Sequence, residues 1–136
     1  MNSIKYKISN TREDLPKIPE IVESASISLA ISEQLGFKIQ LCLDELLTNT
    51  INYGYPDGKI DIITIEFNEF ENTVLLTICD NAIEFNPLSV EEPDISLSLE
   101  DREIGGLGIH FVRKFSQSQK YSRINDMNIL EIEFEK

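Results

Sequence analysis

The chain has 136 residues, a formal net charge of −12 and a hydrophobic content of 41%. This length and composition fit one globular domain over residues 1–136 with its own core, and no apolar run approaches the roughly 20 residues of a membrane helix. The strong negative charge argues against general nucleic-acid binding, which needs a basic surface. Without a secretory signal, Cys42 and Cys79 are expected to be reduced thiols, and we expect a cytoplasmic protein that binds neither nucleic acid nor a membrane.

The N-terminal half predicts one strand followed by two helices. Apolar and polar residues alternate over 3–9, which indicates a strand with one buried face. Thr11 and Asp14 have the spacing of a helix-capping arrangement, so we expect a helix that begins there and is stopped by Gly36. A second helix fits residues 38–53, where apolar residues recur on one side.

The C-terminal half predicts two hairpins separated by a long loop and a helix. The predicted elements are strands over residues 60–67 and 74–79, a loop over 81–104, a helix over 104–115 and strands over 121–124 and 129–134. A loop of this length in a compact domain is usually functional or mobile. The whole order favours an α+β two-layer sandwich, in which helices pack on one face of a mostly antiparallel sheet.

The first candidate for chemistry lies in the second predicted helix. Glu45 and Asn49 are four residues apart, so their side chains share a helix face at the edge of the apolar side. An amide oxygen is a hard ligand that suits Mg²⁺, and a neighbouring carboxylate can orient or deprotonate a nucleophile. The alternative is a solvated helix face without a chemical role.

The second candidate is Asp80, which directly follows the apolar run 74–79. A carboxylate at the end of a buried strand can accept a hydrogen bond from an amine such as the adenine amino group. In an apolar pocket such a bond discriminates strongly, because an unsatisfied polar partner is costly there. The alternative is an aspartate that initiates a turn by bonding nearby backbone amides.

The third candidate is the cluster Gly105-Gly106-Leu107-Gly108 before the last predicted helix. A glycine-rich helix entry lets phosphate oxygens approach backbone amides, and the helix dipole favours the anion. The cluster is neither a P-loop nor a dinucleotide fingerprint, so a hinge or tight turn is an equal alternative. The neighbouring His110 is the single histidine and has no metal-ligand spacing, so we expect a structural role for it.

The order of these motifs resembles a known ATP-binding fold. Glu45-x-x-x-Asn49, then Asp80 with Phe85-Asn86-Pro87, then Gly105 to Gly108, is similar to the domain shared by histidine kinases, gyrase, Hsp90 and MutL. Within that superfamily, the size and the loop sequence resemble the small bacterial anti-sigma-factor serine kinases. The resemblance spans about residues 10–135.

The resemblance implies a role for each matching residue, with ATP and Mg²⁺ as cofactors. It implies Glu45 as the catalytic general base, Asn49 as the Mg²⁺ ligand and residues 81–104 as a lid. The implied nucleotide-binding residues are Asn49, Asp80 for adenine, Ala82, Phe85 and the phosphate-lining Gly105, Gly106, Leu107 and Gly108. Such kinases phosphorylate a serine of a STAS-domain anti-sigma antagonist and also bind a sigma factor, and a homodimer is implied.

Three positions depart from the family pattern. Ala82 stands where a glycine is usual, and it would cost roughly 1–2 kcal/mol if the backbone there needed a positive φ. An extended backbone at Ala82 would make the change harmless. Glu84 places negative charge at the entrance for a polyanion, and Asn128 stands near the place where a serine or threonine is often found.

Two functions of different classes remain. The first is a serine kinase that switches partners by phosphorylation. The second is a binding module of the same fold with weak or no kinase activity, which Ala82 and the acidic loop favour and the intact Glu45 and Asn49 oppose. A third, an ATPase detached from a histidine kinase, is less favoured because the chain has no dimerisation hairpin with a phospho-accepting histidine. Phosphotransfer to a cognate serine protein separates the first two.

Overall fold

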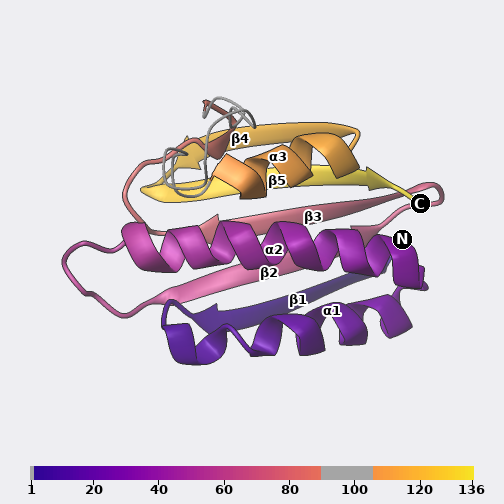
Figure 1. Ribbon diagram of the computed structural model, residues 1–136, viewed down its shortest axis with the longest axis horizontal. Coiled ribbons are helices and arrows are strands. Elements are labelled where there is room, and N and C mark those ends of the chain that lie inside the picture. The colour runs from indigo at the N-terminus through magenta and orange to yellow at the C-terminus, as the bar shows by residue number, and fades with distance from the viewer. Residues whose placement is uncertain (1, 90–105) are drawn as a thin grey trace, which may run out of the picture.

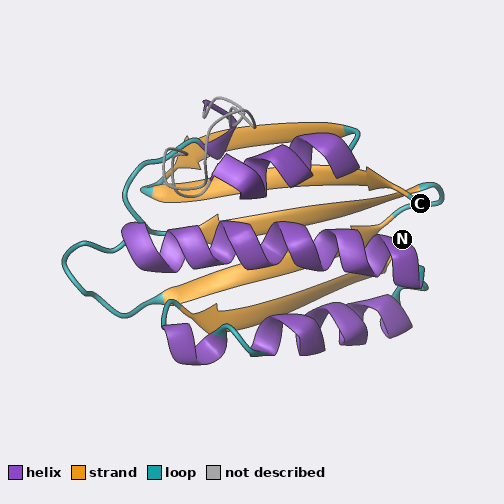
Figure 2. Ribbon diagram, viewed as in Figure 1, coloured by secondary structure: helices purple, strands orange, loops and turns teal. Residues whose placement is uncertain are grey.

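A computed structural model describes residues 2–89 and 106–136, and within these ranges helices cover one face of a five-stranded sheet (Figures 1 and 2). The strands are β1 (Asn2–Ser9), β2 (Ile62–Glu69), β3 (Thr73–Asp80), β4 (Ser118–Ile124) and β5 (Met127–Glu135). The helices are α1 (Lys17–Ser28), α2 (Glu33–Tyr53) and α3 (Gly106–Phe115), with short 3₁₀ turns η1 (Arg12–Asp14) and η2 (Pro87–Ser89).

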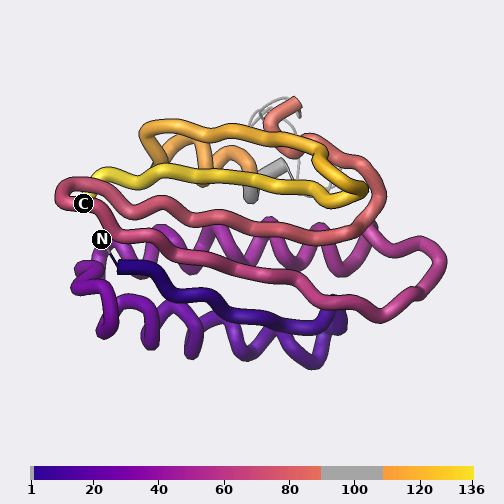
Figure 3. Tube along the Cα trace, turned by 180° about the vertical axis from the view of Figure 1, so that it is seen from behind, coloured from indigo at the N-terminus to yellow at the C-terminus, as the bar shows by residue number. Residues whose placement is uncertain are grey.

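The sheet is antiparallel throughout, with the strand order β1-β2-β3-β5-β4. Seen from behind, the tube of the five strands lies in front of all three helices (Figure 3), so no helix within the described residues covers the other face of the sheet. This arrangement confirms the predicted α+β two-layer sandwich. Each strand therefore needs only one apolar face, which explains the alternation of buried and less buried residues along β2, β3 and β5.

The core lies between the sheet and the helices. Phe67 of β2 is opposite Leu76 of β3, and its ring meets that of Tyr6 edge to face with centroids 6.0 Å apart. The largest fully buried side chains are Phe67, Phe134, Ile8, Ile18, Ile39, Leu43, Leu47, Ile63, Ile65, Leu76, Ile109 and Ile132. At about 25 cal/mol per Å² of buried apolar surface, this cluster supplies the main stabilisation of the fold.

The prediction of one helix from Thr11 up to Gly36 is wrong. The chain forms α1, breaks after Ser28 and starts α2 at Ser32, whose hydroxyl accepts a hydrogen bond from Leu35 N at 3.1 Å. Gly36 is inside α2, where a Cβ would lie 3.1 Å from Ser26 Oγ of α1. The absence of a side chain at Gly36 lets α1 and α2 approach closely. This role cannot be recognised when the glycine is interpreted as a helix stop signal.

The expected cap at Thr11 also differs from the structure. Thr11 makes no side-chain cap to the turn that follows, and its hydroxyl instead lies 2.7 Å from Ser9 Oγ. Asp14 Oδ2 accepts a hydrogen bond from Ser9 N at 2.7 Å, so its carboxylate reaches back to β1 rather than capping a helix. The segment after β1 is therefore a short 3₁₀ turn tied to the strand.

The other predicted helices and strands are confirmed, with shifted ends, whereas residues 90–104 of the predicted loop lie outside the described residues. The two hairpins are present, and Asn125 and Asp126 form the last turn with φ of 52° and 62°, as a two-residue hairpin turn requires. Cys42 and Cys79 are free, and burial raises the pKa of Cys42 to about 12. None of the helices in the described part of the chain combines the length and apolar character that crossing a membrane requires.

Several elements converge at one end of the sandwich. The end of α2, the end of β3, the start of β5 and the start of α3 lie on the same side, opposite the N- and C-termini (Figure 1). The residues singled out from the sequence come from these segments. The topology thus brings three separated motifs to one end of the molecule.

Candidate functional site

A cavity of about 540 Å³ opens at this end, between α2 and α3 on one side and the sheet on the other. Most of its wall is apolar, with a few polar groups, which is the usual make-up of a small-molecule site. Its described lining residues are Leu46, Asn49, Thr50, Tyr53, Gly54, Ile78, Asp80, Ala82, Ile83, Glu84, Phe85, Pro87, Ile109, Tyr121, Asn128 and Leu130.

Asp80 is the buried carboxyl of this cavity. It is the last residue of β3 and is only 6% exposed. Its Oδ1 accepts two hydrogen bonds, from Ala82 N at 3.0 Å and from Asn128 Nδ2 at 2.9 Å. Burial raises the pKa of Asp80, and these two donors with the charge of Arg123 partly oppose the rise. The first bond is the turn-forming contact expected as the alternative, yet the carboxyl also lines the cavity.

Asn128 lies opposite Asp80 in the register of β3 and β5 and is also buried. Its amide contacts four partners: Asp80, the carbonyl of Ile83, the amide of Phe85 and the hydroxyl of Tyr121. Sequence reasoning treats Asn128 only as a departure from the family pattern. The available signal is its place on the core-facing side of β5, where its neighbours at two-residue spacing are all apolar.

Ala82 carries none of the backbone strain considered for it. Among the described non-glycine residues with positive φ, Ala82 is absent, and its side chain is buried. A Cβ placed on Gly54 would lie 2.7 Å from the Ala82 methyl, so this methyl packs directly against the end of α2. The extra methyl relative to glycine is thus accommodated by a glycine across the wall.

The loop after α2 is hydrogen-bonded to the segment after β3. Gly54 O accepts from Ile83 N at 3.0 Å, and Tyr55 Oη donates to Asn81 Oδ1 at 3.2 Å. Asn81 Nδ2 in turn donates to Asp61 Oδ2. Burial raises the pKa of Tyr55, so its hydroxyl stays protonated. These bonds hold the wall around Asp80 from two sides.

α2 presents the first motif beside this wall. Asn49 lines the cavity, whereas Glu45, one turn earlier on the same face, is half-buried and outside the lining. Within the described residues Glu45 makes no hydrogen bond or ion pair. Burial raises the pKa of the adjacent Asp44, and the charge of Glu45 adds to that rise. Asn49 and Asp80 therefore line the same cavity, whereas Glu45 lies one helical turn before Asn49, outside the lining.

The glycine cluster lies at the start of α3. Gly106, Leu107 and Gly108 are the first residues of the helix, and Ile109 lines the cavity. The free backbone amides of this helix start are suited to an anion. Gly105 lies outside the described residues, as does most of the predicted lid: of residues 81–104, the structure describes 81–89.

The described part of this segment contributes Ala82, Ile83, Glu84, Phe85 and Pro87 to the cavity lining. Phe85 is 53% exposed, and its backbone amide donates to Asn128 Oδ1 at 3.3 Å. Glu84 lies in the same wall and brings negative charge to it. The turn that follows is held to α3, since Arg113 donates to Leu88 O at 2.7 Å.

The donor set fits a metal ion held largely by a phosphate ligand. No three His, Cys, Asp or Glu side chains within residues 2–89 and 106–136 are grouped to hold a metal. Asn49 supplies an amide oxygen at the cavity wall, and Mg²⁺ is usually bound by one or two protein oxygens together with phosphate and water. The residues present suit that arrangement and no all-protein metal cage.

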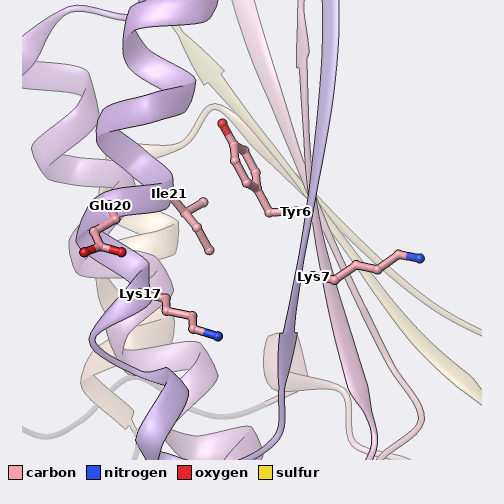
Figure 4. Close-up of a pocket in the computed structure, with 5 residues that line it drawn as sticks. All are labelled: Tyr6, Lys7, Lys17, Glu20 and Ile21. Atoms are coloured by element: carbon pink, nitrogen blue, oxygen red, sulfur yellow. The ribbon is translucent and has the colours of Figure 1, made fainter.

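A smaller hollow of about 250 Å³ lies between β1 and α1 (Figure 4). Lys7 points away from it to the far side of the strand, and the Lys17 amine is 3.1 Å from Asp14. The Tyr6 hydroxyl donates to Ser24. Of the two lysines that line this hollow, one therefore points away from it and the other is paired with a carboxylate.

Comparison with known proteins places these features in a family. The family model described as histidine kinase-like ATPase domain matches residues 8–134. The chain is 30% identical over 99 residues to the serine/threonine-protein kinase BtrW of Bordetella bronchiseptica, covering 73% of this chain and 70% of that protein. It is 24% identical over 117 residues to the serine-protein kinase RsbW of Listeria monocytogenes, covering 78% and 74%.

Among solved structures, the chain is similar to a histidine kinase domain from the blue-light activated histidine kinase EL346 of Erythrobacter litoralis. The identity is 10% and the TM-score is 0.49, with 88% of this chain covered. The chain spans 59% of the length of that protein chain.

Proposed function

This chain belongs to the histidine kinase-like ATPase domain family, and on that premise we propose that it is a Mg·ATP-dependent protein serine kinase of the anti-sigma-factor type. The observation that carries the proposal is the pairing of Asp80 and Asn49 on the wall of one 540 Å³ cavity. A buried carboxyl selects a base, and an amide oxygen beside it suits a phosphate-bound Mg²⁺. The similarity to proteins named as serine kinases supports the same activity.

In this proposal Asp80 accepts a hydrogen bond from the adenine amino group. Its Oδ1 is already bonded to Ala82 N and Asn128 Nδ2, so Oδ2 is the oxygen for the base. The apolar wall formed by Ile78, Leu130 and their neighbours packs on the ring. A base without the amino group would leave the buried carboxyl unpaired, which costs about 1–3 kcal/mol.

At the other end of the cavity the phosphates meet Asn49 and the start of α3. Asn49 would hold Mg²⁺ through its amide oxygen, and a bound Mg²⁺ supplies charge neutralisation between the phosphates. The N-terminal amides of α3, at Gly106 to Gly108, would donate to phosphate oxygens. These groups position and stabilise charge, which is most of what phosphoryl transfer requires.

Glu45 would act on the acceptor serine. It lies one helical turn before Asn49 on the same face and has no hydrogen bond or ion pair within the described residues, so its carboxylate is open to an incoming hydroxyl. Glu45 would serve as the general base by accepting the serine proton as the serine oxygen bonds to the γ-phosphorus. The bond between that phosphorus and the β,γ-bridging oxygen would break, and ADP would leave. Its place outside the cavity lining suits a group that meets a protein substrate rather than the nucleotide.

We propose a STAS-domain anti-sigma antagonist as the acceptor, and a sigma factor as the second partner, with the protein acting as a cytoplasmic homodimer. Support comes from the resemblance to anti-sigma-factor kinases and from the similarity to RsbW and BtrW. Phosphorylation of the antagonist would decide which partner is held.

A catalytically weak binding module of the same fold is the second candidate. The observation that favours it is Glu84 in the cavity wall, where its charge opposes a polyanion. Ala82 does not support this candidate through backbone strain, because the backbone there has no positive φ.

Phosphotransfer separates the two candidates. The purified protein, with ATP labelled at the γ-phosphate and Mg²⁺, is mixed with STAS-domain proteins encoded by the same genome. Label on a serine of one of them supports the kinase. Nucleotide binding with no transfer to any of them, together with a stable complex with one, would favour the binding module.

A further inference from the structure

We propose that Asn128 is a positioning residue that holds Asp80 as a hydrogen-bond acceptor and thereby makes the cavity select 6-amino over 6-oxo purine nucleotides. The inference deepens the proposed function and rests on it. It starts from the observation that two of the three buried polar or charged residues in the described part of the chain, Asp80 and Asn128, face each other across neighbouring strands.

The hydrogen-bonding capacity of Asn128 is fully used. A side-chain amide has two N–H donors and an oxygen with two lone pairs. Its Nδ2 donates to Asp80 Oδ1 and to Ile83 O, both at 2.9 Å. Its Oδ1 accepts from Tyr121 Oη at 2.6 Å and from Phe85 N at 3.3 Å. Asn128 therefore has no group left for a base and acts on the ligand only through its partners.

These contacts also fix which way the amide faces. Ile83 O can accept only from the nitrogen of Asn128, and Phe85 N can donate only to the oxygen. A reversed amide would place an N–H against Phe85 N and an oxygen against Ile83 O. The nitrogen is thus held toward Asp80 by groups of the segment that follows β3.

These contacts give the two carboxylate oxygens of Asp80 different hydrogen-bonding roles. Oδ1 is occupied by two N–H donors, from Asn128 and Ala82, so it cannot carry the proton. Within the described residues Oδ2 has no hydrogen bond, and Asp80 lines the cavity. The same two donors favour the ionised carboxylate, and in that form Oδ2 is an acceptor.

An acceptor at this place distinguishes purines by the group at position 6. The amino group of adenine donates to Oδ2, whereas the oxo group of hypoxanthine opposes it with another acceptor. A mismatch of this kind in a buried site is costly because both groups lose their partners. Without the Asn128 donor, burial would favour the neutral carboxylic acid, which can donate to an oxo group as well as accept from an amine.

The test compares ATP with ITP, whose purine carries an oxo group in place of the amino group at position 6 and a hydrogen on N1. Affinities of both nucleotides with Mg²⁺ are measured by calorimetry for the wild type, Asn128→Leu, Asn128→Thr and the control Asn10→Leu. The wild type is expected to prefer ATP by at least about tenfold. Asn128→Leu keeps the approximate size but removes the donor, and its ATP-to-ITP preference should fall to within about threefold.

The other two variants separate positioning from a general loss of order. Threonine offers one donor, so Asn128→Thr should regain part of the preference. Asn10→Leu removes the other buried amide of the described residues, which bonds Lys59 O and Asp61 N and is not among the cavity-lining residues, and it should keep a preference close to that of the wild type. An equal loss of preference in Asn10→Leu and Asn128→Leu would overturn the proposal.

The outcomes also separate this proposal from the proposed function. A wild type that binds ATP selectively, with the full preference retained in folded Asn128→Leu, overturns the role of Asn128 alone. A wild type that binds neither nucleotide overturns both. If Asn128→Leu does not fold, Asn128→Thr decides: a preference below that of the wild type supports the proposal, and an unchanged one rejects it.

Discussion

The two ends of the cavity are built differently. Around Asp80, hydrogen bonds join the buried side chains of Asp80 and Asn128, partly buried side chains of β4 and the backbone of the turn after α2. Around Asn49 and Glu45 the polar side chains are half-buried on a helix face, with backbone amides of α3 as the other component.

This difference is the one that the proposed function requires. A base is recognised by one or two hydrogen bonds in an apolar place, so the protein must hold its own groups still before the ligand arrives. Phosphates and Mg²⁺ bring their own charge and ligands, so the protein needs only donors and oxygens within reach. We therefore expect changes near Asp80 to affect binding and stability, and changes near Glu45 to affect transfer.

The largest expected effect is at the end of the cavity near Asn49 and Glu45, and it concerns the rate of phosphotransfer. Glu45→Ala should lower the rate of phosphotransfer to the acceptor serine by about 10²–10⁴-fold, because it removes the proposed general base. ATP affinity should stay unchanged, since Glu45 is not part of the cavity lining. Single-turnover phosphotransfer and calorimetry measure the two quantities.

Glu33→Ala provides the matched control, because Glu33 is an exposed acid in the first turn of the same helix. It should leave transfer at the wild-type rate. If Glu45→Ala also transferred at that rate, the role assigned to Glu45 would be wrong and the two ends would not have separate functions.

The next largest effect is at the Asp80 end of the cavity and concerns the stability of the fold. Gly54→Ala places a Cβ 2.5 Å from Thr50 O and 2.7 Å from the Ala82 methyl, so the wall must shift. Overpacking of this kind costs about 1–3 kcal/mol of unfolding free energy, and nucleotide affinity should fall with it. Thermal unfolding and calorimetry measure both. Adding Ala82→Gly should recover part of the loss.

Gly58→Ala is the control for that substitution. Gly58 has φ of +73°, and a Cβ there meets nothing within 4 Å. The variant should lose about 1 kcal/mol through backbone strain alone and keep its nucleotide affinity. Equal losses of affinity in both glycine variants would show that the contact between Gly54 and Ala82 has no special effect on the cavity.

The smallest expected effect concerns Asp14, in the turn after β1 and away from both ends of the cavity. It tests whether nucleotide binding is independent of the stability that this turn contributes. The Ser9 amide and then Lys17 hold the pKa of Asp14 below its ordinary value. A lowered folded-state pKa stabilises the fold at pH above the ordinary value near about 3.9, and this contribution is lost as pH falls through the folded-state pKa. Asp14→Asn should therefore be less stable than the wild type near neutral pH, and the difference should close in acid.

Denaturant unfolding at several pH values measures this difference, with Glu13→Gln as the exposed neighbouring control. Nucleotide affinity should be the same in both variants. A stability difference for Asp14→Asn that did not change with pH would show that the Asp14 contribution is not electrostatic.

Local patterns predict most of the fold. The alternation along β2, β3 and β5 has a direct physical cause, since one face of the sheet packs on helices and the other does not. The break between α1 and α2 escapes a local pattern, because Gly36 has the sequence position of a stop signal. Its actual role is steric and depends on Ser26 from another helix.

The site is predictable in part for the same reason. Asp80 and Asn49 stand out by type and position, and the fold brings both to one cavity. The contribution of Asn128 depends on the β3–β5 register, and the accommodation of Ala82 depends on Gly54 across the wall. Both are contacts between segments far apart in the sequence.

The most direct test of the central claim is a calorimetric titration with ATP, with and without Mg²⁺, of the wild type and Asp80→Asn. The account predicts saturable binding that is stronger with Mg²⁺ in the wild type. It also predicts that Asp80→Asn, which turns the acceptor into an amide, weakens binding by about 5- to 150-fold. No saturation at millimolar ATP, or equal affinity in the two proteins, would contradict the assignment of this cavity as an adenine nucleotide site.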